Sequence, residues 1–144
     1  EDVVRAQVAL ESWWYQTATG DPTSDLAACH PLLRGESSTC PESVGLGQVR
    51  FAYHSVAFAH DNAIASSAYN VDYTYSFWRS CYDGSMTWVR DVEGGSSYAA
   101  GDTWACVGLW YSGRWLTPPA RSYIDAVQQN LSSRVWETSD FLAG

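Results

Sequence analysis

The sequence predicts a mainly helical fold, and three observations support this. Several segments carry apolar residues at helical spacing, strong stop signals separate them, and no run shows convincing strand alternation. The chain has 144 residues, of which 46% are hydrophobic and 17% charged, a balance that suits a folded core and not a disordered chain. We therefore expect residues 1–144 to form a single domain.

The first part of the chain is predicted to contain one helix and one long loop. Val3 to Trp14 has no Gly or Pro and carries apolar residues at helical intervals, and Gly20-Asp21-Pro22 is a stop signal. Residues 21–43 are polar and rich in Pro and Ser, which predicts a loop, with a short β-hairpin as the alternative. The next element is expected near Gly45.

Three further helices are predicted from their end signals. Ser66 or Ser67 is the expected N-cap of the first, which stops at Gly84. Asp102 and Gly113 bound the second, and Thr117-Pro118 starts the last helix. The expected apolar faces are Ile64, Ala68, Val71, Tyr75 and Trp78 on the first, Trp104, Val107 and Tyr111 on the second, and Tyr123, Val127 and Leu131 on the last.

The charge of the chain argues against several classes of partner. It has 16 acidic and 8 basic side chains, every basic one is Arg, and the net charge is −8. Because phosphate binding needs clustered cations, we expect neither nucleic acid nor an anionic membrane as the main partner. No apolar run approaches the ~20 residues of a membrane-spanning helix, and Glu1 to Arg5 lack the pattern of a signal peptide.

The four cysteines suggest an oxidising compartment. Cys29, Cys40, Cys81 and Cys106 allow three pairings, and the simplest joins Cys29 to Cys40 and Cys81 to Cys106. Four buried free thiols are the alternative. Because the chain has no C-x-x-C spacing and its His residues have no zinc-finger spacing, we expect no metal site.

Glu11 is the first candidate for catalytic chemistry. It precedes Ser12, Trp13 and Trp14, and a carboxyl group with such apolar neighbours is expected to hold a proton near neutral pH. A carboxylic acid of this kind can protonate a leaving group. The alternative is an ordinary Glu on a helix surface.

Five short motifs extend this interpretation. In chain order they are Glu11-Ser12, Gly45-Leu46-Gly47-Gln48, Tyr69-Asn70-Val71, Trp110-Tyr111-Ser112-Gly113 and Ser122-Tyr123-Ile124. As an ordered set they resemble glycoside hydrolase family 23, which comprises the soluble lytic transglycosylases and goose-type lysozymes. The resemblance covers nearly the whole chain and implies a lysozyme-like helical domain.

The resemblance also implies a role for each motif. Glu11 would be the general acid and then the general base, and Ser12 would orient its carboxylate. The cleft and its N-acetyl sugars would be contacted by Gly45, Leu46, Gln48 and Tyr111, with Asn70 holding the fold nearby and Tyr123 as a further candidate. Simple core packing is the alternative for both tyrosines.

The chain departs from the family pattern at three places. Residues 21–43 form an insertion between Glu11 and the Gly45 turn, Gly47 replaces a Met, and Tyr111-Ser112-Gly113 replaces Tyr-Asn-Ala-Gly. Eight Trp and nine Tyr exceed the needs of a small core, so stacking on sugar rings is an alternative to core packing. The candidates for stacking are Trp13, Trp88, Trp110 and Trp115.

The expected activity is cleavage of the β-1,4 bond between N-acetylmuramic acid and N-acetylglucosamine in peptidoglycan. A single apparent carboxylic acid favours a lytic transglycosylase, which leaves 1,6-anhydro ends and needs no cofactor. The first alternative is hydrolysis of peptidoglycan or chitin, as in goose-type lysozymes, with a second carboxylate from Asp21, Asp25, Glu36 or Glu42. The second is a non-catalytic glycan-binding or virion-associated module. In each case we expect a monomer that is secreted, associated with the cell wall or carried on a phage virion.

Overall fold

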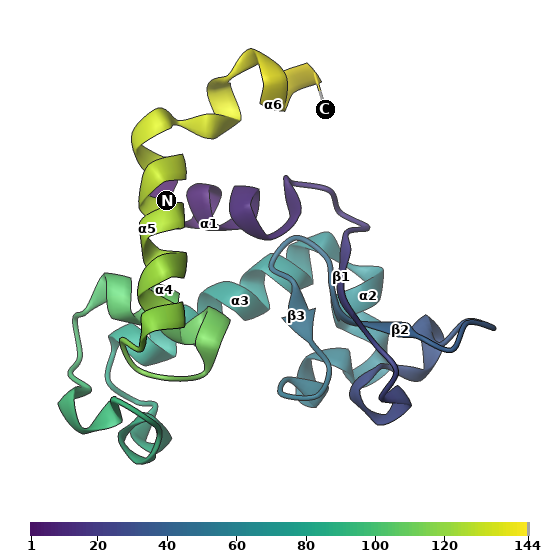
Figure 1. The fold of residues 1–144 in the computed structure, drawn as a ribbon, viewed down its shortest axis with the longest axis horizontal. Helices are drawn as coiled ribbons and strands as arrows, with labels where there is room; N and C mark the ends of the chain where they lie inside the picture. Colours follow the sequence, from purple (N-terminus) through teal and green to yellow (C-terminus); the bar gives the residue numbers. More distant parts are fainter. Residues whose placement is uncertain (144) are drawn as a thin grey trace. The chain divides into compact units, whose positions relative to one another are not determined.

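The computed structural model describes residues 1–143, which are mainly helical with a small antiparallel sheet (Figure 1). The predicted fold class is thus confirmed at the level of a mainly helical chain. The helices are α1 (Asp2–Ser12), α2 (Asn62–Ala65), α3 (Ser67–Tyr82), α4 (Thr103–Ser112), α5 (Pro118–Ser133) and α6 (Ser139–Ala143). The strands are β1 (Thr19–Thr23), β2 (Cys40–Val44) and β3 (Val49–Arg50), and short 3₁₀ segments connect several of these elements.

The described chain divides into two compact units. Unit 1 comprises Glu1–Leu10 and the described residues from Tyr75 onward, and unit 2 comprises Glu11–Thr74. Helices α1 and α3 each contribute residues to both units. The two units are described separately below, and a single domain stays a prediction.

Unit 1 is built on an apolar core among helices. One buried cluster contains Ala6, Ala9, Val107, Tyr123, Val127, Trp136 and Phe141. A second contains Cys81, Val89, Tyr98, Ala105, Cys106, Leu109 and Trp115. Helix α4 contributes to both clusters because its residues from Ala105 to Trp110 are all buried.

The predicted helix ends in unit 1 are confirmed. The Asp102 carboxylate accepts a hydrogen bond from the Ala105 amide at 2.9 Å, which satisfies one of the free N–H groups at the start of α4. Gly113 ends α4 with a φ of 64°, and Pro118 opens α5. Helix α5 is not the last helix, however, because α6 follows it.

The prediction for α1 was wrong at its C-terminal end. The helix stops at Ser12, because Trp13 and Trp14 adopt positive φ angles of 51° and 62°. The predicted stop signal at residues 20–22 lies within β1 instead. The local helical pattern therefore extended two residues too far.

The predicted apolar face of α3 was wrong in part, since Trp78 packs against both buried clusters of unit 1. Ala68 and Tyr75 are exposed, whereas the helix buries Asn70, Thr74 and Cys81, a stripe that includes two polar residues. The predicted N-cap is confirmed, since the Ser66 hydroxyl accepts a hydrogen bond from the Tyr69 amide at 3.1 Å. The polar residues of the buried stripe have hydrogen-bond partners in unit 2.

Unit 2 contains the sheet, in the order β1-β2-β3. Strand β1 pairs with β2 in antiparallel register from Thr19 opposite Val44 to Thr23 opposite Cys40. The β-hairpin that was the alternative for residues 21–43 is thus present, with a long loop between its strands. The element expected near Gly45 is β3, and Gly45 itself lies in the turn that joins β2 to β3.

Both predicted disulfides are present. Cys29 and Cys40 join the loop to the start of β2 in unit 2, with Cα atoms 6.2 Å apart. Cys81 and Cys106 join α3 to α4 in unit 1, with Cα atoms 5.7 Å apart. Two disulfides are compatible with an oxidising, extracytoplasmic environment.

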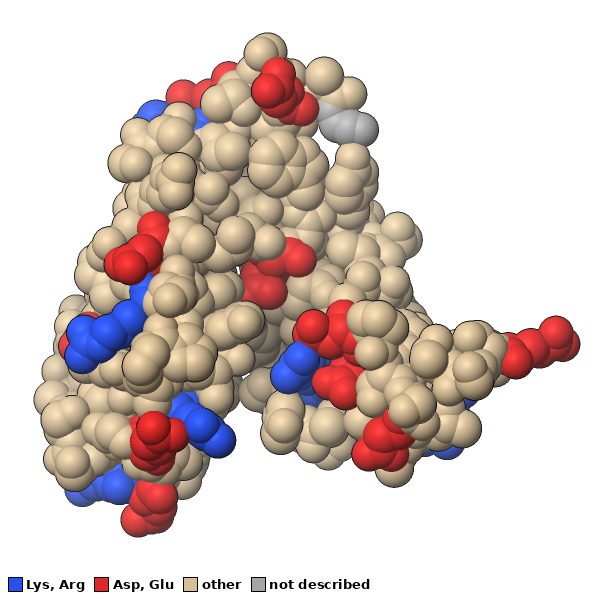
Figure 2. Space-filling model, in the orientation of Figure 1, with Lys and Arg blue, Asp and Glu red and all other residues tan. Residues whose placement is uncertain are grey.

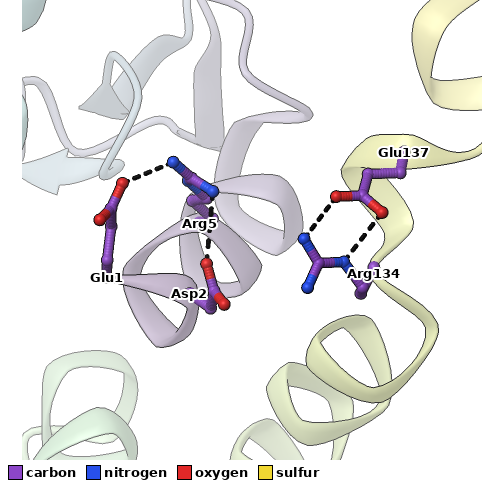
Figure 3. A network of polar contacts seen from close by, with 5 residues as sticks. All are labelled: Glu1, Asp2, Arg5, Arg134 and Glu137. Carbon is purple, nitrogen blue, oxygen red and sulfur yellow. Dashed lines mark hydrogen bonds and ion pairs between the residues drawn. The ribbon is translucent and has the colours of Figure 1, made fainter.

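Several arginine side chains on the surface are paired with acidic ones. Figure 2 shows a face made mostly of uncharged residues, with blue and red groups next to each other. In unit 1, Arg5 pairs with Glu1 and Asp2, and Arg134 donates to Glu137 at 2.8 Å (Figure 3). The hydrogen bond from Arg134 holds the pKa of Glu137 below its usual value.

Candidate functional site

Glu11 and Ser12 lie in the last turn of α1. Glu11 is half-buried, and Ser12 is buried with its carbonyl accepting a hydrogen bond from the Tyr15 amide at 2.9 Å. That Glu11 holds a proton near neutral pH stays a prediction.

The turn Gly45–Gln48 is fixed to the chain segment that follows Glu11. The Ala18 carbonyl accepts hydrogen bonds from the Gly45 amide at 2.8 Å and from the Gln48 side chain at 3.2 Å. The Gln48 side chain also donates to the Gly45 carbonyl at 2.9 Å, and its oxygen accepts from the Ser43 hydroxyl at 2.7 Å. Gln48 therefore holds the turn together, whereas the sequence predicted that its amide contacts sugars.

Asn70 connects the same turn to helix α3. Its side chain is fully buried; its oxygen accepts from the Gly47 amide at 2.8 Å, and its nitrogen donates to the Val44 and Ala63 carbonyls, both at 3.0 Å. One amide side chain thus satisfies three backbone groups from β2, the turn and α2. Asn70 therefore fixes the turn to β2 and α2, and its expected place near a sugar-binding cleft stays a prediction.

Two glycines allow this close approach. A Cβ atom on Gly45 would lie 2.4 Å from Asn70 Nδ2, and one on Gly47 would lie 2.1 Å from Thr74 Oγ1. Either distance is too short for a non-bonded contact. The presence of Gly47 where the resembled family has Met follows from Thr74, whose side chain occupies the space next to the turn.

The four acidic residues of segment 21–43 either bond to neighbouring groups or are exposed on the surface. Arg50 pairs with Asp21 at 2.6 Å and with Glu42 at 3.6 Å, which ties the three strands together. The Asp25 carboxylate accepts from the Ala27 amide at 3.0 Å and caps a 3₁₀ turn, and Glu36 is exposed. Asp21 and Glu42 therefore already have a partner that holds them between the strands.

The predicted residues Tyr111 and Tyr123 lie in unit 1. Their rings stack in parallel with centroids 4.7 Å apart; Tyr123 is buried in the core, and Tyr111 is 57% exposed. The Ser112 hydroxyl bonds to the Gly108 and Arg114 carbonyls and closes the end of α4. The expected proximity of Tyr111 to Glu11 stays a prediction.

The four tryptophans that the sequence singled out differ in burial. Trp110 and Trp115 are core residues, whereas Trp13 and Trp88 are 38% and 44% exposed. Sequence reasoning gave no role to Trp14 and Tyr15, which are also exposed. The available signal was the run of three aromatic residues directly after Glu11-Ser12.

Unit 2 also contains a histidine that sequence reasoning passed over. The Nδ1 atom of His54 lies 3.2 Å from the hydroxyl of Tyr73, whose ring stacks on Tyr69. Burial lowers the pKa of His54 and raises the pKa of Tyr73, so both groups are uncharged at neutral pH.

The described residues show neither a metal cluster nor a membrane-spanning helix. Within residues 1–143, no group of three or more His, Cys, Asp or Glu side chains is placed to hold a metal ion. Within the same range, no helix combines the length and the apolar character that crossing a bilayer requires. No protein-family model, curated protein or solved structure gives a significant match to this chain.

Proposed function

We propose that this chain is a peptidoglycan lytic transglycosylase with Glu11 as its single acid and base. The observation that carries the proposal is that two motifs of the resembled family, the Gly45–Gln48 turn and Asn70, are hydrogen-bonded to each other and to the segment that follows Glu11. The Gly45–Gln48 turn bonds to Asn70 on one side and to Ala18, seven residues after Glu11, on the other. This arrangement supports a cleft in which the turn has a fixed position relative to the catalytic segment.

One carboxyl group is sufficient for the proposed reaction. Glu11 protonates the glycosidic oxygen as the bond to the N-acetylmuramic acid carbon breaks, and the N-acetyl group of that sugar stabilises the positive charge. The Glu11 carboxylate then removes the proton from the C6 hydroxyl of the same sugar, whose oxygen bonds to C1. The product is a 1,6-anhydro end, and no water is consumed.

The competing reaction is hydrolysis, which needs a second carboxylate to position water. The pairing of Asp21 and Glu42 with Arg50 argues against these two, and the cap made by Asp25 argues against a third. Glu36 remains as an exposed residue on the loop. These surroundings favour the transglycosylase over the lysozyme.

Mass spectrometry of products from purified peptidoglycan tests the proposal. The native chain should release fragments with anhydro ends, and Glu11→Gln should lower the rate by at least ~100-fold, the usual contribution of a general acid. Glu36→Gln is the matched control, because it makes the same chemical change in the same unit and should retain activity within a few-fold. Reducing ends would support hydrolysis, and no cleavage by the native chain would support a glycan-binding module.

A further inference from the structure

The two residues that follow Glu11-Ser12 have an unusual backbone conformation. Trp13 and Trp14 have φ angles of 51° and 62°, in the left-handed region. Bulky side chains rarely adopt this region, because the Cβ atom then crowds the following carbonyl group. Such strain persists only where the surrounding structure imposes it, and it is concentrated at functional sites.

Hydrogen bonds hold this strained segment at both ends. The Tyr15 amide donates to the Ser12 carbonyl at 2.9 Å, and the Ala18 amide donates to the Tyr15 carbonyl at 3.1 Å. The Ala18 carbonyl in turn accepts from Gly45 and Gln48. The segment is therefore fixed between the end of α1 and the Gly45–Gln48 turn, and its side chains are presented in a set orientation.

The aromatic side chains of this segment remain accessible. Trp13, Trp14 and Tyr15 are 38%, 40% and 52% exposed. The stretch from Ser12 to Gly20 contains no charged residue. Exposed aromatic rings that each carry one polar group suit a ligand with an apolar face and hydroxyl groups, and a pyranose ring has both.

We propose that Trp13, Trp14 and Tyr15 form an aromatic platform that stacks against an N-acetylhexosamine ring beside the bond that Glu11 cleaves. The inference rests on the proposed function and names the residues that hold the sugar. Trp13 follows Glu11 by two residues, so their Cα atoms are at most about 7 Å apart. The platform is therefore confined to the sugars next to the cleaved bond.

Calorimetric titration with a soluble N-acetylglucosamine hexamer tests the platform. The parent is Glu11→Gln, which prevents turnover during the measurement. Adding Trp13→Ala, Trp14→Ala or Tyr15→Ala should raise Kd by about tenfold for at least one position, and Phe at that position should restore much of the binding, since it keeps an aromatic face. Tyr53→Ala is the control, because Tyr53 is an exposed aromatic residue with no assigned place in the site, and its loss should leave Kd unchanged.

A comparison of Gly and Ala at position 14 separates a binding role from a structural one. Both substitutions remove the same ring, so both should weaken binding equally. Gly tolerates positive φ, so Trp14→Gly should melt about 4 °C above Trp14→Ala. Equal Kd values with different Tm values would show that binding follows the ring and not the stability of the fold.

Two results would overturn the platform. Hexamer binding with an unchanged Kd in all three Ala variants would remove it while leaving the proposed function standing. The platform would also be overturned if the Glu11→Gln parent bound neither the hexamer nor purified peptidoglycan. The proposed function itself fails only in the cleavage assay, where the native chain would release no anhydro ends.

Discussion

The two units of this chain are stabilised by different kinds of interaction. Unit 1 buries large apolar side chains such as Leu109, Val127 and Trp115. Unit 2 has a smaller apolar core and depends on polar groups with defined partners, chiefly Asn70 and Gln48. The residues proposed for catalysis lie in the second kind of environment.

This difference explains where a precise site can be built. Apolar burial has little directional preference, so a core tolerates changes of shape when the volume is kept. Hydrogen bonds fix both distance and angle, and a buried group that loses its partner is costly. A set of such bonds therefore holds the turn Gly45–Gln48 in one position relative to α3.

The largest expected effect comes from replacing Asn70. Asn70→Leu keeps a side chain branched at Cγ but leaves the Gly47 amide and the Val44 and Ala63 carbonyls unpaired, which should cost about 3–5 kcal/mol of unfolding free energy. Leu109→Met is the matched change in unit 1 and should cost less than about 1.5 kcal/mol. Urea unfolding measures both, and an Asn70→Leu protein of native stability would remove the proposed contrast.

Loss of a disulfide should destabilise either unit by about 3 kcal/mol, since each bridge restricts the unfolded chain. Cys81 and Cys106 are 25 residues apart and Cys29 and Cys40 are 11 apart, so the chain-entropy effect is somewhat larger in unit 1. Thermal unfolding of the two double Ala variants tests this order. A larger loss for the Cys29–Cys40 variant would contradict this order. It would show that the smaller apolar core of unit 2, and not chain entropy alone, sets the effect of its bridge.

Gly47→Ala should destabilise the protein by about 1–3 kcal/mol, because the added Cβ overlaps Thr74 Oγ1. Thr74→Ala removes that oxygen, so the double variant should be more stable than the sum of the two single changes predicts. A double-mutant cycle by urea unfolding measures this coupling. Simple additivity would show that the turn moves away from α3 instead.

The smallest effect concerns pH and is expected in unit 2, which contains all three histidines. Burial lowers the pKa of His54 in the folded state, so below a pH of about 6.5 the unfolded chain binds more protons and stability falls. The loss levels off once the pH is below the folded pKa. His54→Gln should remove this part of the pH dependence, whereas replacing the exposed His60 should not.

Several features followed from the sequence because their signals are local. The cap at Asp102, the stop at Gly113 and the start at Pro118 each depend on residues within one turn of the helix end. The disulfide pairing followed from the short separation of the cysteines. The order of the motifs singled out Glu11 and Asn70, and their roles in catalysis and at a cleft stay predictions.

Tertiary structure alone decided the end of α1, the buried face of α3 and the partners of Gln48. Hydrogen bonds to Ala18 and Asn70 join residues 23 to 30 positions apart, and no local pattern in the sequence marks such pairs. Helical periodicity assigns burial to apolar residues, so it missed a face on which Asn70 and Thr74 are buried with their hydrogen bonds satisfied. It likewise continued α1 through Trp13 and Trp14, because left-handed backbone at two tryptophans depends on the contacts that hold the following segment in place.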